Sequence, residues 1–158
     1  MTRLYGRAPT NERVNDYVPD VRFERNSMIS ALNLKGVVAP LMFKGTLDGK
    51  LFAGYVEKVL SPELSPGDIV VMDNCSAHKV AKVLDPIYKK GAKVLFLPPY
   101  SPDLNPIEPM WSKMKSSLRK LEPRSAEELR EASSQSIDLI NCEDIRGWFN
   151  YYGYSVSV

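Results

Sequence analysis

The chain has 158 residues, a length that fits a single domain with a hydrophobic core of its own. A net charge of +2 is too small to indicate a polyanionic partner by itself, and no apolar run reaches the roughly 20 residues of a membrane-spanning helix. Cys75 and Cys142 lack CxxC spacing and the N-terminal residues lack a signal peptide's apolar core, so we expect a soluble cytoplasmic protein with free thiols and no membrane partner.

The first half of the chain predicts a hairpin, a helix and a strand. Residues 1–26 are polar and irregular, and a connector this long is uncommon unless it has a role, which hints at a missing upstream segment. Two β-prone runs, 27–34 and 37–43, flank Lys35-Gly36 and predict a hairpin. Asp48 is typical of the cap of a helix through Leu60, and the apolar run 68–72 predicts a strand buried on both faces.

The second half predicts a helix over 79–90 that ends before Gly91, a buried strand over 93–97, and two further helices. The pair Asn105-Pro106 predicts the start of the first of these, with Asn as the cap and Pro at the first helical position. Its apolar residues repeat at steps of four, three, four and three: Ile107, Trp111, Met114, Leu118 and Leu121. The last helix covers 125–140, and the aromatic end of the chain is expected to dock on the domain.

This order of elements predicts a mixed α/β sheet flanked by helices. Ligand and catalytic residues of such sheets lie at strand ends and in the adjoining loops. Asp73 follows the strand over 68–72, and Glu108 lies in the first turn of the helix that follows Asn105-Pro106.

Asp73 and Glu108, with 34 residues (74–107) between them, are the candidate catalytic and metal-binding residues. Each has an ordinary structural explanation, since Asp-Asn is a good turn pair and Glu is favoured in a helix's first turn. Together they point to a metal site, because two neighbouring carboxylates repel unless a cation lies between them. Mg²⁺ prefers such carboxylates combined with phosphate oxygens.

Basic residues follow Glu108 on the same predicted helix, where they are candidates for binding a nucleic-acid backbone. The candidates are Lys113, Lys115, Arg119 and Lys120. The alternative is an ordinary solvated helix face. His78, the only histidine, forms a C-x-x-H pair with Cys75, but no second pair exists for a structural zinc site. We expect His78 to be a polar neighbour of Asp73.

Two segments, VVMDNCSAHK and LPPYSPDLNPIEPMWSKMKSSLR, make the sequence resemble the catalytic core of mariner-type transposases and their bacterial insertion-sequence relatives. The resemblance includes YGRAP near the start and GWFNYYGY near the end, so that it covers essentially the whole chain as one catalytic domain, residues 1–158. It implies a ribonuclease H-like fold and a triad of two Asp and a third acid that binds two Mg²⁺ or Mn²⁺ ions. Asp73 matches the second Asp and Glu108 the third acid.

The resemblance also assigns supporting roles to Asn74 and His78, which match the family's D-N-x-x-x-H pattern, and to Asn105 and Pro106 of its N-P-I-E loop. The implied chemistry is phosphoryl transfer on DNA: hydrolytic cleavage at a transposon end, followed by attack of the freed 3′ hydroxyl on target DNA. Two metal ions about 4 Å apart would stabilise the attacking and leaving oxygens.

The chain departs from the family at its start, because the first, central strand with its Asp and the upstream helix-turn-helix region have no counterpart in the sequence. Asp16 and Asp20 follow no predicted strand and are not candidates for the first acid. We therefore expect a partial domain that is inactive alone, which decay, a misplaced start codon, or a second reading frame joined by frameshifting would explain. Its expected protein partner is a second copy or an upstream reading-frame product. The alternative is a non-catalytic nucleic-acid-binding remnant or regulator, and the sequence leaves open whether the chain is itself an enzyme.

Overall fold

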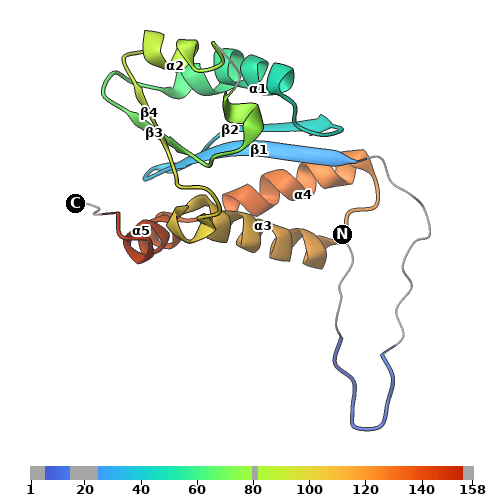
Figure 1. Cartoon of the computed structure of the whole chain (residues 1–158). Helices are drawn as coiled ribbons and strands as arrows, with labels where there is room; N and C mark the ends of the chain where they lie inside the picture. The colour runs from blue at the N-terminus through green and yellow to red at the C-terminus, as the bar shows by residue number, and fades with distance from the viewer. Residues whose placement is uncertain (1–5, 15–24, 80–81, 155–158) are drawn as a thin grey trace.

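The structure is a computed structural model that describes residues 6–14, 25–79 and 82–154. Helices lie above and below a central layer of strands (Figure 1). The strands are β1 (Asn26–Asn33), β2 (Gly36–Lys44), β3 (Ile69–Met72) and β4 (Lys93–Phe96). The helices are α1 (Gly49–Tyr55), α2 (Asp85–Lys89), α3 (Ile107–Leu121), α4 (Ala126–Asp138) and α5 (Cys142–Tyr151). No helix of these described segments is long and apolar enough to cross a membrane.

The predicted hairpin is confirmed as the antiparallel pair β1–β2. The side chain of Asn33 closes its turn by accepting hydrogen bonds from the backbone N–H groups of Lys35 (2.8 Å) and Gly36 (3.0 Å). The register shifts between Ile29 and Ala31, and opposite this shift Ala39 has a positive φ of 52°. This bulge explains how β2 accommodates Pro40, which cannot donate a hydrogen bond to a regular ladder.

The predicted helix after Asp48 is confirmed, and its cap is formed as expected. The Asp48 carboxylate accepts a hydrogen bond of 2.7 Å from the N–H of Leu51. The helix continues beyond α1 as a π-helical turn, Val56–Leu60, and a short 3₁₀ turn, Ser61–Glu63. Its apolar face is buried against the strand layer.

β3 and β4 form a parallel pair in which Met72 lies opposite Phe96, and the bounds of both predicted strands are confirmed to within one residue at each end. The predicted burial on both faces is wrong, because Ile69 is 63% and Leu95 54% exposed. The Leu97 N–H extends the ladder with a 2.8 Å hydrogen bond to the Met72 carbonyl. The carboxyl ends of the two strands therefore lie at the same edge.

The single mixed sheet that the sequence predicts is not formed by the described strands. They make two separate sheets of two strands each, β1–β2 and β3–β4. Both sheets nevertheless pack on the same layer, because one core cluster joins Ile29 and Leu41 of the hairpin, Val70 and Val94 of the parallel pair, and the helix that begins with α1. The other face of the hairpin is covered by α3 and α4, against which Met28 packs.

The helix predicted over 79–90 is wrong for most of its length. Only α2 is α-helical, residues Ser76–Lys79 form a 3₁₀ turn, and Val80 lies outside the described residues. Pro86 explains the late start of α2: it has no N–H to donate and its ring clashes with a preceding helical turn. Lys82 also has a positive φ of 63°, which breaks any helix there.

The long helix α3 is confirmed, but its first residue is not the predicted one. Pro106 occupies the cap position and Asn105 precedes it, with the Asn105 side chain accepting a long hydrogen bond of 3.4 Å from the N–H of Ile107. The predicted last helix corresponds to α4, capped by Ser125.

The sequence did not predict α5, whose start is a capping box between Asn141 and Asp144. The aromatic end docks as expected: the Tyr154 hydroxyl donates a 2.9 Å hydrogen bond to the Leu104 carbonyl, in the loop before α3.

Candidate active site

Asp73 lies directly after β3, at the edge where β3 and β4 both end. Its side chain is 60% exposed, and its Oδ1 atom accepts a hydrogen bond from the backbone N–H of Cys75 (3.1 Å). The same Oδ1 atom lies 2.8 Å from His78 Nδ1, which is also within 3.3 Å of the Asp73 backbone carbonyl oxygen. The second carboxylate oxygen has no hydrogen-bond partner among the described residues. One oxygen is therefore held by the protein while the other is available to a ligand.

His78 connects Asp73 to the hydrophobic core. The His78 side chain is only 16% exposed, and its ring packs on the buried ring of Phe52 with 4.3 Å between centroids and 38° between planes. Phe52 belongs to α1, whose position depends on the core cluster described above. His78 lies beside Asp73, as the sequence predicts. The contact of Phe52 with His78 was not predicted, because in the sequence Phe52 looks like any other core residue of an amphipathic helix.

Asn74 follows Asp73 and has a polar atom in an unusual setting. Its side-chain oxygen Oδ1 is buried and has no hydrogen-bond partner in the part of the chain that the structure describes. Buried polar atoms are nearly always paired, because an unpaired one has lost its hydrogen bond to water. Asn74 Oδ1 is thus a buried acceptor without a donor among the described residues.

Glu108 lies in the first turn of α3, after the loop that leaves β4. Its backbone N–H donates to the Asn105 carbonyl at 3.1 Å, which fixes the helical turn, and Pro106 beside it is buried. The Glu108 carboxylate is exposed and makes no hydrogen bond or ion pair with any described residue. Asp73 follows β3 directly, whereas Glu108 is separated from the neighbouring strand β4 by the loop over 97–106.

The donor chemistry of Asp73 and Glu108 fits a hard divalent cation, since carboxylate oxygens are what Mg²⁺ and Mn²⁺ prefer. The two are not a complete set: in residues 6–14, 25–79 and 82–154 no group of three or more His, Cys, Asp or Glu side chains could hold a metal ion. The described residues therefore form no complete metal site.

The predicted basic residues of α3 fall into two groups. Lys113 forms a 2.5 Å ion pair with Asp144 of α5, so its charge holds two helices together. Lys115 and Lys120 are exposed and Arg119 is partly exposed, and none of these three has an ion-pair partner in the described ranges. Only the latter three present unpaired positive charge at the surface of α3.

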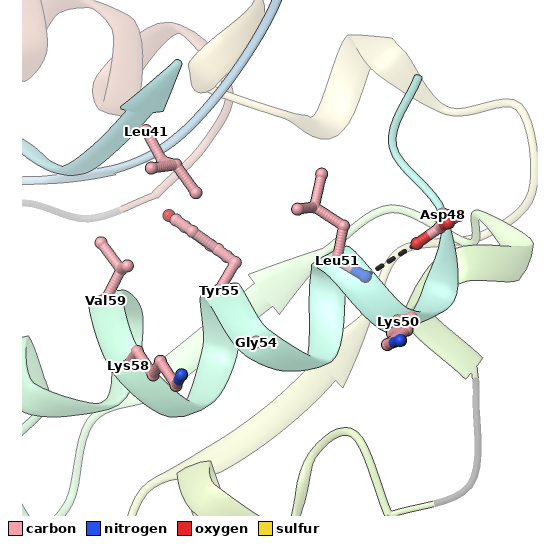
Figure 2. Close-up of a pocket in the computed structure, with 8 residues that line it drawn as sticks. All are labelled: Leu41, Asp48, Lys50, Leu51, Gly54, Tyr55, Lys58 and Val59. Carbon is pink, nitrogen blue, oxygen red and sulfur yellow. Dashed lines mark hydrogen bonds between the residues drawn. The ribbon is translucent and has the colours of Figure 1, made fainter. Parts of the chain in front are cut away.

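A pocket elsewhere on the domain contains none of the predicted site residues. It lies between Leu41 of β2 and residues of α1 and the π-helical turn, with Tyr55 and Val59 among its lining residues (Figure 2). Its walls are mainly apolar, so the candidate site remains at the strand ends.

Comparison with solved structures identifies the fold. The Mos1 strand transfer complex matches with a TM-score of 0.73 and 18% identity over 96% of this chain and 47% of that chain. The Mos1 mariner paired-end complex with Mn has a TM-score of 0.76 and 18% identity, covering 96% of this chain and 48% of that chain. The catalytic domain of Mos1 mariner transposase has a TM-score of 0.68 and 17% identity, covering 83% of this chain and 76% of that chain. A comparison with curated protein sequences gave no match.

These likenesses confirm a mixed α/β fold of short sheets and helices that matches the ribonuclease H-like catalytic domain of Mos1. The chain spans about half the length of the Mos1 chains in the two complexes. A family model described as DDE superfamily endonuclease matches residues 1–130, which include both Asp73 and Glu108. The chain therefore belongs to the DDE superfamily endonucleases.

Proposed function

We propose that this chain is the catalytic domain of a DNA transposase, in which Asp73 and Glu108 supply two of the three carboxylates that bind divalent metal ions. The observation that carries the proposal is the placement of both acids after adjacent parallel strands, each with carboxylate oxygen that no described residue engages. When bound, two Mg²⁺ or Mn²⁺ ions would supply the charge stabilisation that phosphoryl transfer requires. Asp73 and Glu108 would hold those ions, as implied by the DDE family.

DNA is the proposed partner, and the proposed location of the chain is the cytoplasm. Its supporting observations are the unpaired cations of α3 and the similarity to Mos1 structures, one of which is a paired-end complex with the left transposon end. Lys115, Arg119 and Lys120 lie on the helix that begins beside Glu108, so a phosphate backbone bound along α3 would lead to the carboxylates. Lys113 is a weaker candidate because it is paired with Asp144.

We further propose that the site is completed by a strand that lies between the two strand pairs and carries the third acid. Two observations support this. The pairs β1–β2 and β3–β4 pack against the same helix but form no backbone hydrogen-bond ladder with each other. In addition, the buried Asn74 Oδ1, next to Asp73, has no hydrogen-bond donor among the described residues. A backbone N–H of such a strand would satisfy that acceptor.

Metal binding tests the role of the two carboxylates. Mn²⁺ titration, followed by the relaxation of water protons, should show weak binding to the chain and its loss in Asp73→Asn and in Glu108→Gln. Asp103→Asn is the matched control, because Asp103 is an exposed carboxylate in the same loop region and is no part of the site. Equal Mn²⁺ binding by all four proteins would overturn the assignment.

Strand cleavage tests the completeness of the site. The chain of residues 1–158 should not cleave a transposon-end duplex in Mg²⁺, whereas a chain to which a strand with the third acid has been added should, and Asp73→Ala should abolish that activity. Robust cleavage by the 158-residue chain that is lost in Asp73→Ala would refute incompleteness and leave the catalytic role standing.

The second candidate function is a non-catalytic DNA-binding protein or regulator of a transposase, favoured by the unpaired cations of α3. Binding through phosphates alone weakens with salt, and the slope of this dependence falls by about 0.9 for each phosphate that the protein no longer neutralises. For this alternative, Glu108→Gln would leave DNA affinity unchanged in Mg²⁺, and Lys115→Ala would reduce the slope. For the catalytic domain, Glu108→Gln would also change the Mg²⁺ dependence of binding.

A further inference from the structure

The series of contacts from Phe52 through His78 to Asp73 joins the core to the candidate site. Phe52 is buried in the face of α1 that packs on the strand layer. The His78 ring lies on it, and the backbone of His78 is held in its 3₁₀ turn by a 3.1 Å hydrogen bond from its N–H to the Cys75 carbonyl. Both the ring and the backbone of His78 are thus fixed next to Asp73.

The partners of His78 determine which ring nitrogen carries the proton. Nδ1 lies 2.8 Å from Asp73 Oδ1 and 3.3 Å from the backbone carbonyl oxygen of Asp73. An ionised carboxylate and a carbonyl can only accept hydrogen bonds, so Nδ1 must be the donor. In the neutral imidazole the proton is therefore on Nδ1, and Nε2 has the lone pair.

The stacking contact fixes the plane of the His78 ring. A half-turn flip of the ring about its bond to Cβ would keep this plane and the contact with Phe52, but would place a carbon atom instead of Nδ1 beside Asp73. The contact with Phe52 therefore holds the ring next to Asp73, and the oxygens of Asp73 select the face of the ring that carries Nδ1.

We propose that His78, held by Phe52, is a positioning residue that orients the Asp73 carboxylate so that its second oxygen faces a divalent cation. That Asp73 binds a metal ion rests on the proposed function, whereas the contacts among Phe52, His78 and Asp73 do not depend on it. A polar side chain that contacts a metal-binding carboxylate helps to fix the orientation of that ligand, and the loss of such a partner typically costs about 10–100-fold in metal affinity. Phe52 thereby acquires a role in the site although it is buried in the core.

The presence of a single histidine in the chain makes the proposal directly measurable. Long-range ¹H–¹⁵N spectra of imidazole-labelled protein, at a pH where the ring is neutral, report the tautomer of His78 without any resonance assignment. The wild-type chain should show the Nδ1–H form. Asp73→Ala should return the ring to the Nε2–H form, and Phe52→Leu should reduce the ratio of Nδ1–H to Nε2–H by about fivefold, the equivalent of one net hydrogen bond.

Two variants separate positioning from a general effect on folding. Phe43→Leu replaces a different Phe, which lies partly buried in β2, and should leave the tautomer ratio unchanged. Phe52→Tyr keeps an aromatic face and should retain the Nδ1–H form. If Phe52→Leu does not fold, Phe52→Met fills a similar volume with a flexible side chain and takes its place.

The Nε2–H form in the wild-type chain, or a ratio in folded Phe52→Leu equal to that in Phe43→Leu, would overturn the proposal. Mn²⁺ titration of the same proteins gives a second measurement, in which Phe52→Leu should bind at least about tenfold more weakly than Phe43→Leu. Failure of the wild-type chain to bind Mn²⁺ would count against the proposed function while leaving the tautomer result intact. Equal Mn²⁺ affinity of the two variants would show that Phe52 does not position the ligand.

Discussion

At the scale of single residues, Tyr55 contrasts with His78. Both are polar aromatic residues near α1, but His78 uses its polar atom while the Tyr55 hydroxyl is buried with no partner among the described residues. Figure 2 shows the Tyr55 ring extending from the helix toward Leu41 of β2. Burial of this hydroxyl also raises the pKa of Tyr55 well above its usual range, because the phenolate would be poorly solvated there.

Tyr55→Phe should therefore raise the free energy of unfolding by about 1 kcal/mol, since it removes an unpaired hydroxyl and keeps the ring. Urea unfolding followed by circular dichroism would measure this. Tyr88→Phe is the control, because the Tyr88 side chain is half exposed and its hydroxyl can bond to water. A loss of stability in Tyr55→Phe would mean that the hydroxyl has a partner in solution.

The same burial predicts a pH dependence. The folded pKa of Tyr55 is raised above the unfolded value, so at alkaline pH the unfolded chain loses the proton first. The contribution of Tyr55 to stability is fully present below about pH 10, the ordinary pKa of tyrosine, and declines as the pH rises above it. The stability difference between Tyr55→Phe and the wild type should accordingly grow above about pH 10 and stay constant between about pH 7 and 9.

At the scale of elements, α5 is held in place by polar contacts as much as by apolar ones. The Asp144 carboxylate accepts a hydrogen bond from the backbone N–H of Asn141 (3.1 Å), in the capping box, and another from Lys113 of α3. The hydrogen bond from Lys113 is the main cause that lowers the pKa of Asp144, against the smaller opposing effect of burial. One carboxylate thus starts α5 and attaches it to the helix that begins beside Glu108.

Because the folded pKa of Asp144 is lowered, its contribution to stability is present above the ordinary Asp pKa, about 4, and is lost as the pH falls below it. Asp144→Asn should remove this acid-dependent part, and Lys113→Met should reduce it, in thermal unfolding measured from about pH 6 down to about pH 3. Glu143→Gln, at an exposed carboxylate of the same helical turn, should behave as the wild type. An identical acid profile for all four proteins would contradict the role of this ion pair.

At the scale of the whole molecule, the two strand pairs are unequally covered. The hairpin β1–β2 has helices on both faces, whereas one face of β3–β4 leaves Ile69 63% and Leu95 54% exposed. Ile69 and Leu95 share this face, because Leu95 lies opposite Val71 and side chains two apart point the same way. Parallel strands are ordinarily buried on both faces, so this surface is apolar without a cover.

We expect the chain to self-associate through this surface at high protein concentration. The double variant Ile69→Thr, Leu95→Thr should sediment as a smaller species than the wild type, with unfolding changed by no more than about 0.5 kcal/mol because both residues are surface positions. Val70→Thr, at a residue packed against the core, should lower stability without changing association. A wild-type chain that is monomeric across the concentration range would contradict the prediction.

Most elements follow from local patterns because their causes are local. Asp48 caps α1, the Asn33 turn closes the hairpin, and the apolar repeat of α3 can be read directly from residue spacing. The helix over 79–90 failed for a reason that was also local, since Pro86 outweighs a modest apolar period. The capping box of α5, formed by Asn141 and Asp144, is likewise a local signal, since its two residues are three positions apart in the sequence.

Residue order was enough to find the two carboxylates, because acids placed after an apolar run and at a helix start keep those positions whatever surrounds them. It was also enough to place His78 near Asp73, five residues away. The folded chain was needed to show that Phe52 holds His78, that Lys113 pairs with Asp144, and that the four strands form two pairs. These features join residues 26 or more positions apart or depend on which strands meet, and such contacts arise from packing rather than from any local preference along the chain.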